Sequence, residues 1–147
     1  MWVELLASMI DDAHFSPGLD EATIAPAERV LRRQLPPDLL ALLRESNGVS
    51  RFKEAWGGVW DSGVIWPLER IVEDNLAIRT DPALTAYCEP FEPLLFFADA
   101  GNGDRFGFDE TAGDSIIAWD HEDDRRHLIA SDLGLFLRGW WTGAIVL

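Results

Sequence analysis

The chain has 147 residues, 48% of them hydrophobic and 26% charged, which suits one globular domain with its own core and excludes a disordered chain. Its 26 acidic residues outnumber 12 basic ones and give a net charge of −14, which disfavours nucleic acids and anionic membranes as partners and favours a cationic protein. One cysteine excludes an internal disulfide. Because the first residues lack a basic leader and no apolar run reaches the roughly 20 residues of a membrane span, we expect a soluble cytoplasmic protein.

The first third of the chain has the apolar spacing of amphipathic helices. Helices are predicted over residues 2–13, from about 23 to 35, and from 37 to the Asn47-Gly48 pair, with a loop over 14–20. Pro36 and Pro37 separate the last two helices, because a proline ring disfavours helical geometry in the residue before it. Asn47 and Gly48 both tolerate the left-handed conformation of a helix C-cap.

After Gly48 the spacing of apolar residues changes to two, which is typical of strands. Short strands are predicted between Ser50 and Trp66, with breaks at Gly57-Gly58 and at Asp61-Ser62-Gly63. Trp66-Pro67 precedes another helical pattern. The segment 80–93 contains three prolines and is predicted to be a long surface loop.

Strands dominate the last third of the chain. Four are predicted: Leu94–Ala98, Arg105–Phe108, Ser115–Trp119 and about Arg126–Ala130. Their connections are short and rich in Gly, Asp or Asn, so consecutive strands are antiparallel neighbours in a meander. Ser131-Asp132 then caps a closing helix from Leu133 to about Trp141. Helices, then a mainly antiparallel sheet, then a helix make an α+β fold, predicted as a single domain over residues 1–147.

The negative charge is concentrated in the turns of this meander. Residues 99–124 contain nine acidic residues and one basic residue, Arg105, so −8 of the −14 lies within 26 residues. The connections 99–104 and 120–125 alternate in the meander and should share one end of the sheet, whereas 109–114 should lie at the other. We hypothesise that the shared end is a binding surface for a cationic partner. Its candidate residues are Asp99, Asn102, Asp104, Asp120, Glu122, Asp123 and Asp124.

The seven tryptophans are the second candidate feature. Trp66 and Trp119 lie in apolar patterns and are predicted to be structural, each with a partner for its indole N–H. Neighbouring helical residues point about 100° apart, so Trp140 and Trp141 cannot be equally buried on one face. An exposed tryptophan is a typical interface anchor. The candidate anchors are Trp56, Trp60 and Trp140.

No motif indicates catalysis, a metal or a cofactor. The cluster Gly101–Gly107 misses the dinucleotide-binding spacing by one residue and lacks the ligands of a calcium loop, which favours a hairpin turn. His121 and His127 are separated by five residues on a turn, not by three on one helical face as in a zinc hydrolase. We therefore predict a non-enzyme without metal or cofactor. An enzyme that uses clustered carboxylates such as Asp99 and Asp104 for acid–base catalysis is a further alternative, ranked below the two binding functions given below.

Five motifs in order resemble the SUKH superfamily, the family of the fungal cell-wall assembly regulators and many bacterial immunity proteins. They are Leu35-Pro36-Pro37-Asp38-Leu39 running to Asn47-Gly48, Trp66-Pro67-Leu68-Glu69 running to Asn75, Phe96–Asp109 with Gly101-Asn102-Gly103-Asp104, Ile117–Glu122, and Ala130-Ser131-Asp132-Leu133 with Phe136-Leu137. The resemblance covers about residues 23–142 and leaves 1–20 as an additional N-terminal helix and loop. Its structural signature residues are Pro36, Asn47, Gly48, Trp66, Pro67, Gly103 and Trp119.

The resemblance implies an α+β domain without catalytic machinery, whose bacterial members mostly neutralise a toxin encoded beside them. We therefore expect an immunity protein that binds a cognate toxin stoichiometrically. A regulatory or scaffolding module like the fungal relatives is the alternative, although those proteins carry long disordered flanks that this chain lacks.

Overall fold

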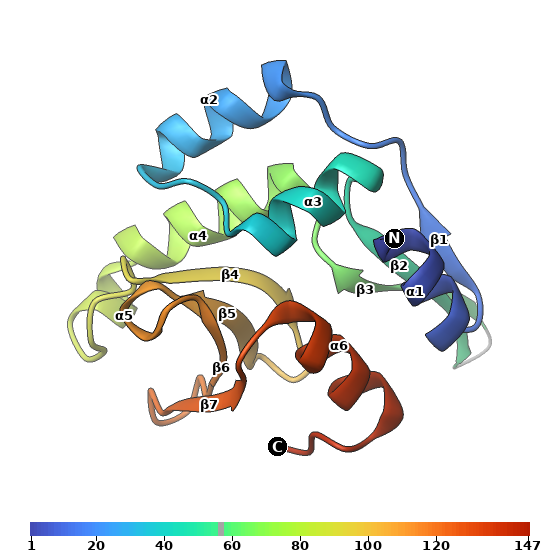
Figure 1. Ribbon diagram of the computed structural model, residues 1–147. Coiled ribbons are helices and arrows are strands. Elements are labelled where there is room, and N and C mark those ends of the chain that lie inside the picture. Colours follow the sequence, from blue (N-terminus) through green and yellow to red (C-terminus); the bar gives the residue numbers. More distant parts are fainter. Residues whose placement is uncertain (56–57) are drawn as a thin grey trace.

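The structure is a computed structural model that describes the backbone of residues 1–55 and 58–147, and the side chains outside 53–62. Figure 1 shows the helices and strands in chain order. They are α1 (Trp2–Met9), β1 (Ala13–Phe15), α2 (Glu21–Leu31), α3 (Pro37–Glu45), β2 (Val49–Ala55), β3 (Gly58–Ile65), α4 (Leu68–Thr80), α5 (Pro82–Thr85), β4 (Leu94–Asp99), β5 (Arg105–Asp109), the 3-10 helix η1 (Glu110–Ala112), β6 (Ser115–Trp119), β7 (Arg126–Ala130) and α6 (Leu133–Thr142).

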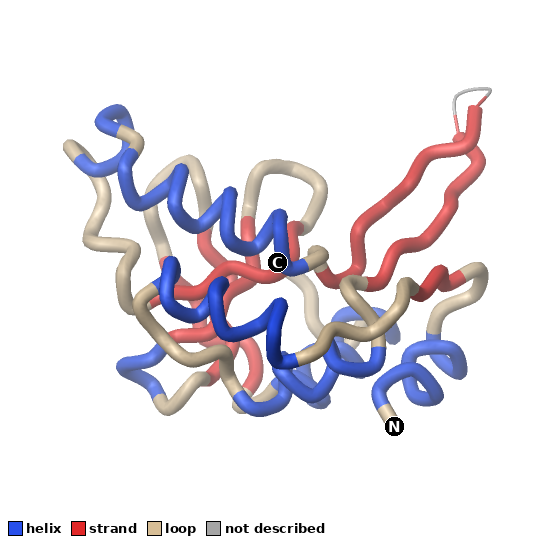
Figure 2. Tube along the Cα trace, turned by 90° about the horizontal axis from the view of Figure 1, so that it is seen from above, coloured by secondary structure: helices blue, strands red, loops and turns tan. Residues whose placement is uncertain are grey.

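The strands form two antiparallel sheets, one of three strands in the order β1-β2-β3 and one of four in the order β4-β5-β6-β7. The second sheet is the predicted meander, and the α+β class is confirmed. The β2–β3 hairpin belongs to the first sheet and projects from the body of the molecule (Figure 2). The sequence pattern predicted strands in the regions of β2–β3 and β4–β7, but it predicted neither β1 nor the division into two sheets.

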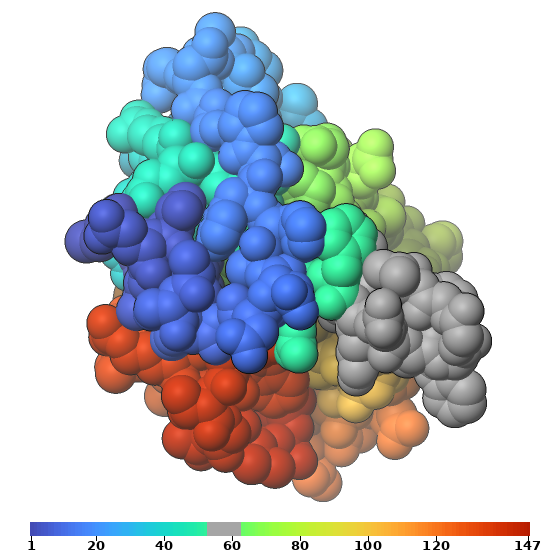
Figure 3. Space-filling model, turned by 90° about the vertical axis from the view of Figure 1, so that its right-hand side faces the viewer, coloured from blue at the N-terminus to red at the C-terminus, as the bar shows by residue number. Residues whose placement is uncertain are grey.

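Helices α2, α3 and α4 stack on one side of the four-stranded sheet, while α6 lies on another (Figure 1). Aromatic rings join α6 to the sheet: Phe136 lies 5.6 Å from Phe97 and 4.7 Å from Phe106 between ring centroids. Near the N-terminus, Trp2 and Leu6 of α1 are buried in the same core. The first and last segments of the chain therefore meet on one face of the molecule (Figure 3).

The outer edge of β4 is covered by α4 instead of by another strand. Asn75 is fully buried, and its Nδ2 donates to the carbonyl of Phe96 (2.8 Å) while its Oδ1 accepts from the Phe96 N–H (2.9 Å). Arg79 donates from Nη2 to the carbonyl of Leu94 (3.2 Å), and the N–H of Trp66 donates to the carbonyl of Phe97 (2.9 Å). These bonds satisfy backbone groups that would otherwise be open to a further strand.

Two predictions for the N-terminal region are wrong. The first helix ends at Met9, and the predicted loop begins with β1, because Ala13–Phe15 pairs with β2 in a contact distant in sequence. The second helix ends at Leu31, since Arg32 adopts the left-handed conformation (φ 57°), four residues before Pro36. Val30, which helical spacing would place on the same side as Ile24 and Ala27, is 51% exposed.

Two predictions for the middle of the chain are also corrected. β3 continues through Asp61-Ser62-Gly63, because each of these residues pairs with β2. The predicted surface loop over 80–93 contains the short helix α5 and the fully buried Phe91, whose ring lies 5.4 Å from that of Trp119. At the C-terminus, Asp132 caps α6 as predicted by accepting from the N–H of Leu135 (2.8 Å).

Candidate functional site

Two loops, 99–104 and 120–125, lie together at one end of the four-stranded sheet, and we call them the acidic end. The β4–β5 pairing ends at Asp99 and Arg105, and the β5–β6 pairing ends at Arg105 and Trp119. Both loops therefore leave the sheet at the same end of its strands. The turn 109–114 lies at the opposite end, where Arg33 donates to Asp114 (3.0 Å). The sheet therefore separates six of the nine carboxylates of this region from the other three.

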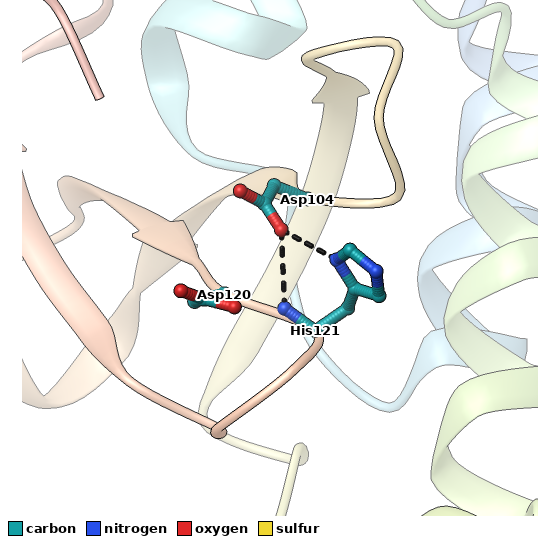
Figure 4. A group of neighbouring side chains, drawn as sticks. All are labelled: Asp104, Asp120 and His121. Carbon is teal, nitrogen blue, oxygen red and sulfur yellow. Dashed lines mark hydrogen bonds and ion pairs between the residues drawn. The ribbon is translucent and has the colours of Figure 1, made fainter.

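His121 joins the two loops of the acidic end (Figure 4). Asp104 Oδ1 accepts from the backbone N–H of His121 (3.1 Å) and lies 2.6 Å from its Nδ1. The hydrogen bond to His121 holds the pKa of Asp104 below its ordinary value, and the same contact raises the pKa of His121. Gly103 is required beneath this ring, because its φ is +102° and a Cβ there would come within 2.9 Å of the imidazole.

Asp104, Asp120 and His121 are also the described residues best placed to hold a metal ion. They come from the two loops shown in Figure 4, and one ligand atom of each lies within 4.8 Å of the others. A site of two carboxylates and one imidazole suits a divalent transition metal. However, Asp104 already accepts two hydrogen bonds from His121, so the contact between loops explains this arrangement without an ion.

Two carboxylates of the acidic end are acceptors for buried tryptophans. Trp66 and Trp119 are each 1% exposed, as expected of structural residues. The indole N–H of Trp66 donates to Asp99 (2.9 Å), and that of Trp119 donates to Asp124 (2.8 Å). Asp124 also accepts from the N–H of Glu89, and its pKa is lowered by these hydrogen bonds against the opposing effect of burial. Asp99 and Asp124 therefore have structural roles in addition to their charge.

The other candidates of the acidic end are more accessible. Asn102, Glu122 and Asp123 are exposed, and Asp120 is half-buried. Asp120 and Asp123 stabilise the β6–β7 loop by accepting from the N–H groups of residues 122 and 125. Glu122 and Asp123 are therefore the most accessible carboxylates of the acidic end.

The predicted aromatic anchors are only partly described. Trp56 and the side chain of Trp60 lie outside the described residues, although the backbone of Trp60 is part of β3. Trp140 and Trp141 are both half-buried, and the Trp140 ring packs 4.9 Å from that of Phe106. Neither side chain is fully buried or fully exposed, as expected of neighbouring helical residues that point in different directions.

A cavity of about 260 Å³ brings one predicted anchor together with the acidic end, and we call it the aromatic cleft. Asp99, Gly101, Trp140 and Trp141 line it, with Arg51 from the hairpin. The Arg51 guanidinium lies 5.9 Å from the Trp141 ring centroid, within the range of a cation–π contact. The sequence pattern did not identify Arg51, because its position depends on three segments that only the fold brings together.

Several signature residues lie at the base of the β2–β3 hairpin, beside a cavity other than the aromatic cleft. Asn47, Gly48, Trp66 and Pro67 line a second cavity of about 420 Å³. Asn47 Oδ1 accepts from the first N–H of α4, that of Leu68 (2.8 Å), and so acts as its cap. Pro36, which is buried, precedes the first residue of α3. These residues hold the junctions between α3, the hairpin and α4.

The architecture and this surface define a class of protein: an α+β domain with a projecting hairpin and a charged end made of hydrogen-bonded loops. The chain matches the model of the SMI1 / KNR4 family (SUKH-1) over residues 18–139 and belongs to that family. Membership supports a non-catalytic interaction domain with protein partners. No curated protein matches the chain in sequence. Among the described residues, no helix has the length and apolar character needed to cross a membrane.

Proposed function

We propose that this protein is a bacterial immunity protein that neutralises a cognate toxin in the cytoplasm by stoichiometric binding. The observation that carries the proposal is the acidic end, where six carboxylates from two loops gather beside the aromatic cleft. Membership in the SMI1 / KNR4 family supports the general role of an interaction domain. A toxin with a cationic surface would be attracted to this end and held there by contacts around the hairpin.

The construction of the acidic end suits binding without turnover. Asp99, Asp104 and Asp124 are fixed by hydrogen bonds to Trp66, His121 and Trp119. A surface held in this way loses little conformational freedom when a partner binds, which favours affinity. The pKa values of Asp104 and Asp124 are lowered, whereas a general acid needs a raised pKa.

Co-expression tests this function. Cells would express the C-terminal toxic domain encoded by the gene neighbouring this protein's gene, with and without the protein. We expect the protein to restore growth and to co-purify with the toxin domain in a one-to-one complex. Failure to restore growth when the protein is expressed and folded would contradict the proposal. Rescue without a stable complex would contradict stoichiometric binding.

A further inference from the structure

A cavity at the far end of the sheet from the acidic end contains an unusual concentration of arginine, and we call it the Arg cavity. It has a volume of about 570 Å³, within the range of small-molecule sites. The C-terminal residues of α2 and α4 and the helix η1 line it, together with Glu92 and Pro93. Three of the chain's 12 basic residues, Arg32, Arg33 and Arg79, lie on its walls.

Arg33 is almost entirely buried, with its side chain 8% exposed. Its Nη2 donates to Asp114 and its Nε to the carbonyl of Gln34 (3.3 Å). Its Nη1 is buried and has no hydrogen-bond partner among the residues that the structure describes. A buried donor without an acceptor is costly, and the cost is greater for a charged group.

Arg79 presents a second donor of the same kind. Its Nη1 and Nη2 donate to the carbonyls of Leu31 (3.1 Å) and Leu94 (3.2 Å), which fixes the guanidinium between α2 and β4. Its Nε is buried and lacks a partner within the described part of the chain. Burial lowers the pKa of Arg79, and the charge of Arg33 adds to this effect against the opposing charges of Glu92 and Glu110.

The remaining walls narrow the choice of ligand. Val30, Leu31, Leu76 and Pro93 supply an apolar surface beside the two arginines. Glu92 and Glu110 on the same walls would repel a dianion such as phosphate more strongly than a monoanion. A single negative charge on an apolar body fits both features, because the charge would accept from the arginines while the body packs against the apolar wall.

We propose that the Arg cavity binds a small carboxylic acid with an apolar body, and that Arg33 and Arg79 turn on binding so that their enclosed Nη1 and Nε, unpartnered among the described residues, donate to its carboxylate. This binding is separate from the proposed neutralisation of a toxin, since the cavity and the acidic end lie at opposite ends of the sheet. The two proposals can therefore fail independently.

Octanoate is the probe that tests this site, with the full ¹⁵N-labelled chain at pH 7. Octanoate should produce saturable shifts of the Arg33 and Arg79 Nε–Hε resonances and of the amides of residues 31–33 and 76–80. Acetate shares the carboxylate and octan-1-ol shares the apolar body, and both should bind at least about tenfold more weakly. Unshifted arginine resonances at saturating octanoate would overturn the proposal, as would equal binding of octan-1-ol.

Variants then assign the carboxylate contact. Arg33→Gln keeps an amide that can donate to Asp114 but removes the charge, and it should weaken octanoate binding by about tenfold or more. Arg29→Gln is the matched control, because Arg29 is exposed on α2 and is not part of the cavity wall. Equal affinity of both variants for octanoate would contradict the proposal. If Arg33→Gln does not fold, the resonance shifts of the unaltered chain still decide the question.

Discussion

Asn75 shows how one side chain can substitute for a strand. It donates to the Ile71 carbonyl within α4 (2.7 Å) and makes two hydrogen bonds with the backbone of Phe96 on β4, while remaining fully buried. The amide is the one side-chain group that offers both a donor and an acceptor in this geometry. Asn75 therefore links the helical layer to the sheet and protects the edge of β4.

Replacing Asn75 by alanine should destabilise the protein by about 2–4 kcal/mol, because it leaves the N–H and carbonyl of Phe96 buried without partners. Urea denaturation followed by tryptophan fluorescence measures this loss. Glu73→Ala is the control on the same helix: Glu73 is exposed, and its replacement should cost less than about 0.5 kcal/mol. Similar midpoints for the two variants would refute the role assigned to Asn75.

The contact between His121 and Asp104 makes a prediction about pH. His121 has a raised pKa, so its stabilising contribution is complete below its ordinary pKa of 6.5 and is lost as pH rises through the higher folded value. Asp104 has a lowered pKa, so its contribution is complete above its ordinary value of 3.8 and is lost as pH falls through the lower folded value. The ion pair is therefore expected to stabilise the loops most between these two ordinary values.

NMR titration of the His121 ring should give a pKa above 6.5 in the unaltered chain. In Asp104→Asn the pKa should fall, because the asparagine carries no negative charge to hold the proton. Asp109→Asn, at the opposite end of the sheet, serves as the control and should leave the His121 titration unchanged. An unaltered pKa in Asp104→Asn would show that the two side chains do not interact in solution.

At the scale of elements, the junction between the hairpin and α4 depends on Gly48. Its φ is +81°, and a Cβ at this position would lie 2.8 Å from the nitrogen of Pro67 and 3.0 Å from the carbonyl oxygen of Ile65. Both contacts are to backbone, which cannot move without displacing the start of α4. Gly48 is therefore needed for the close approach as well as for its backbone conformation.

Gly48→Ala should destabilise the protein by more than about 2 kcal/mol, since backbone strain and steric overlap add together. Gly101→Ala is the matched control, because Gly101 has a similar φ of +85° but nothing lies within 4 Å of its would-be Cβ. That substitution should cost only about 1 kcal/mol, from backbone strain alone. Thermal unfolding of both variants measures the difference, and equal losses would show that the contact with Pro67 is unimportant.

The sequence predicted those elements that depend on residues close together in the chain. The strands of the meander are short and mostly apolar, and polar turns separate them. Asp132 precedes α6 in the pattern of a cap. β1 could not be predicted in this way, because its three residues are a strand only through pairing with β2. Phe91 likewise lies in a segment of proline-rich composition and is buried only because it meets Trp119 across the fold.

For the candidate site, the sequence indicated where charge gathers but not what the charge does. The alternation of strands correctly placed loops 99–104 and 120–125 at one end. The acceptors of the two buried indoles were not predicted from the sequence. Asp99 is 33 residues from Trp66, and Asp124 reaches Trp119 only through the fold of the β6–β7 loop. Arg33 and Arg79, separated by 46 positions, form a common wall only after α2 packs beside α4.

Across the whole molecule, charge is distributed unevenly. The acidic end holds six carboxylates, and three of them, Asp99, Asp123 and Asp124, form ion pairs with Arg70, Arg125 and Arg126. The opposite end of the sheet combines the three carboxylates of the turn 109–114 with the arginines of the Arg cavity. Under the proposed function, a cationic partner would be steered toward the acidic end, and such steering raises association rates by roughly 10- to 1,000-fold at low ionic strength.

The salt dependence of association with the proposed toxin partner tests steering by the acidic end most directly. The rate constant, measured by stopped-flow fluorescence, should fall steeply as salt rises. The double variant Glu122→Gln with Asp123→Asn should associate more slowly and with a weaker salt dependence. The variant Glu92→Gln with Glu110→Gln also removes two negative charges, but at the opposite end, and should behave like the unaltered protein. A rate indifferent to salt, or equal effects of the two double variants, would contradict binding through the acidic end.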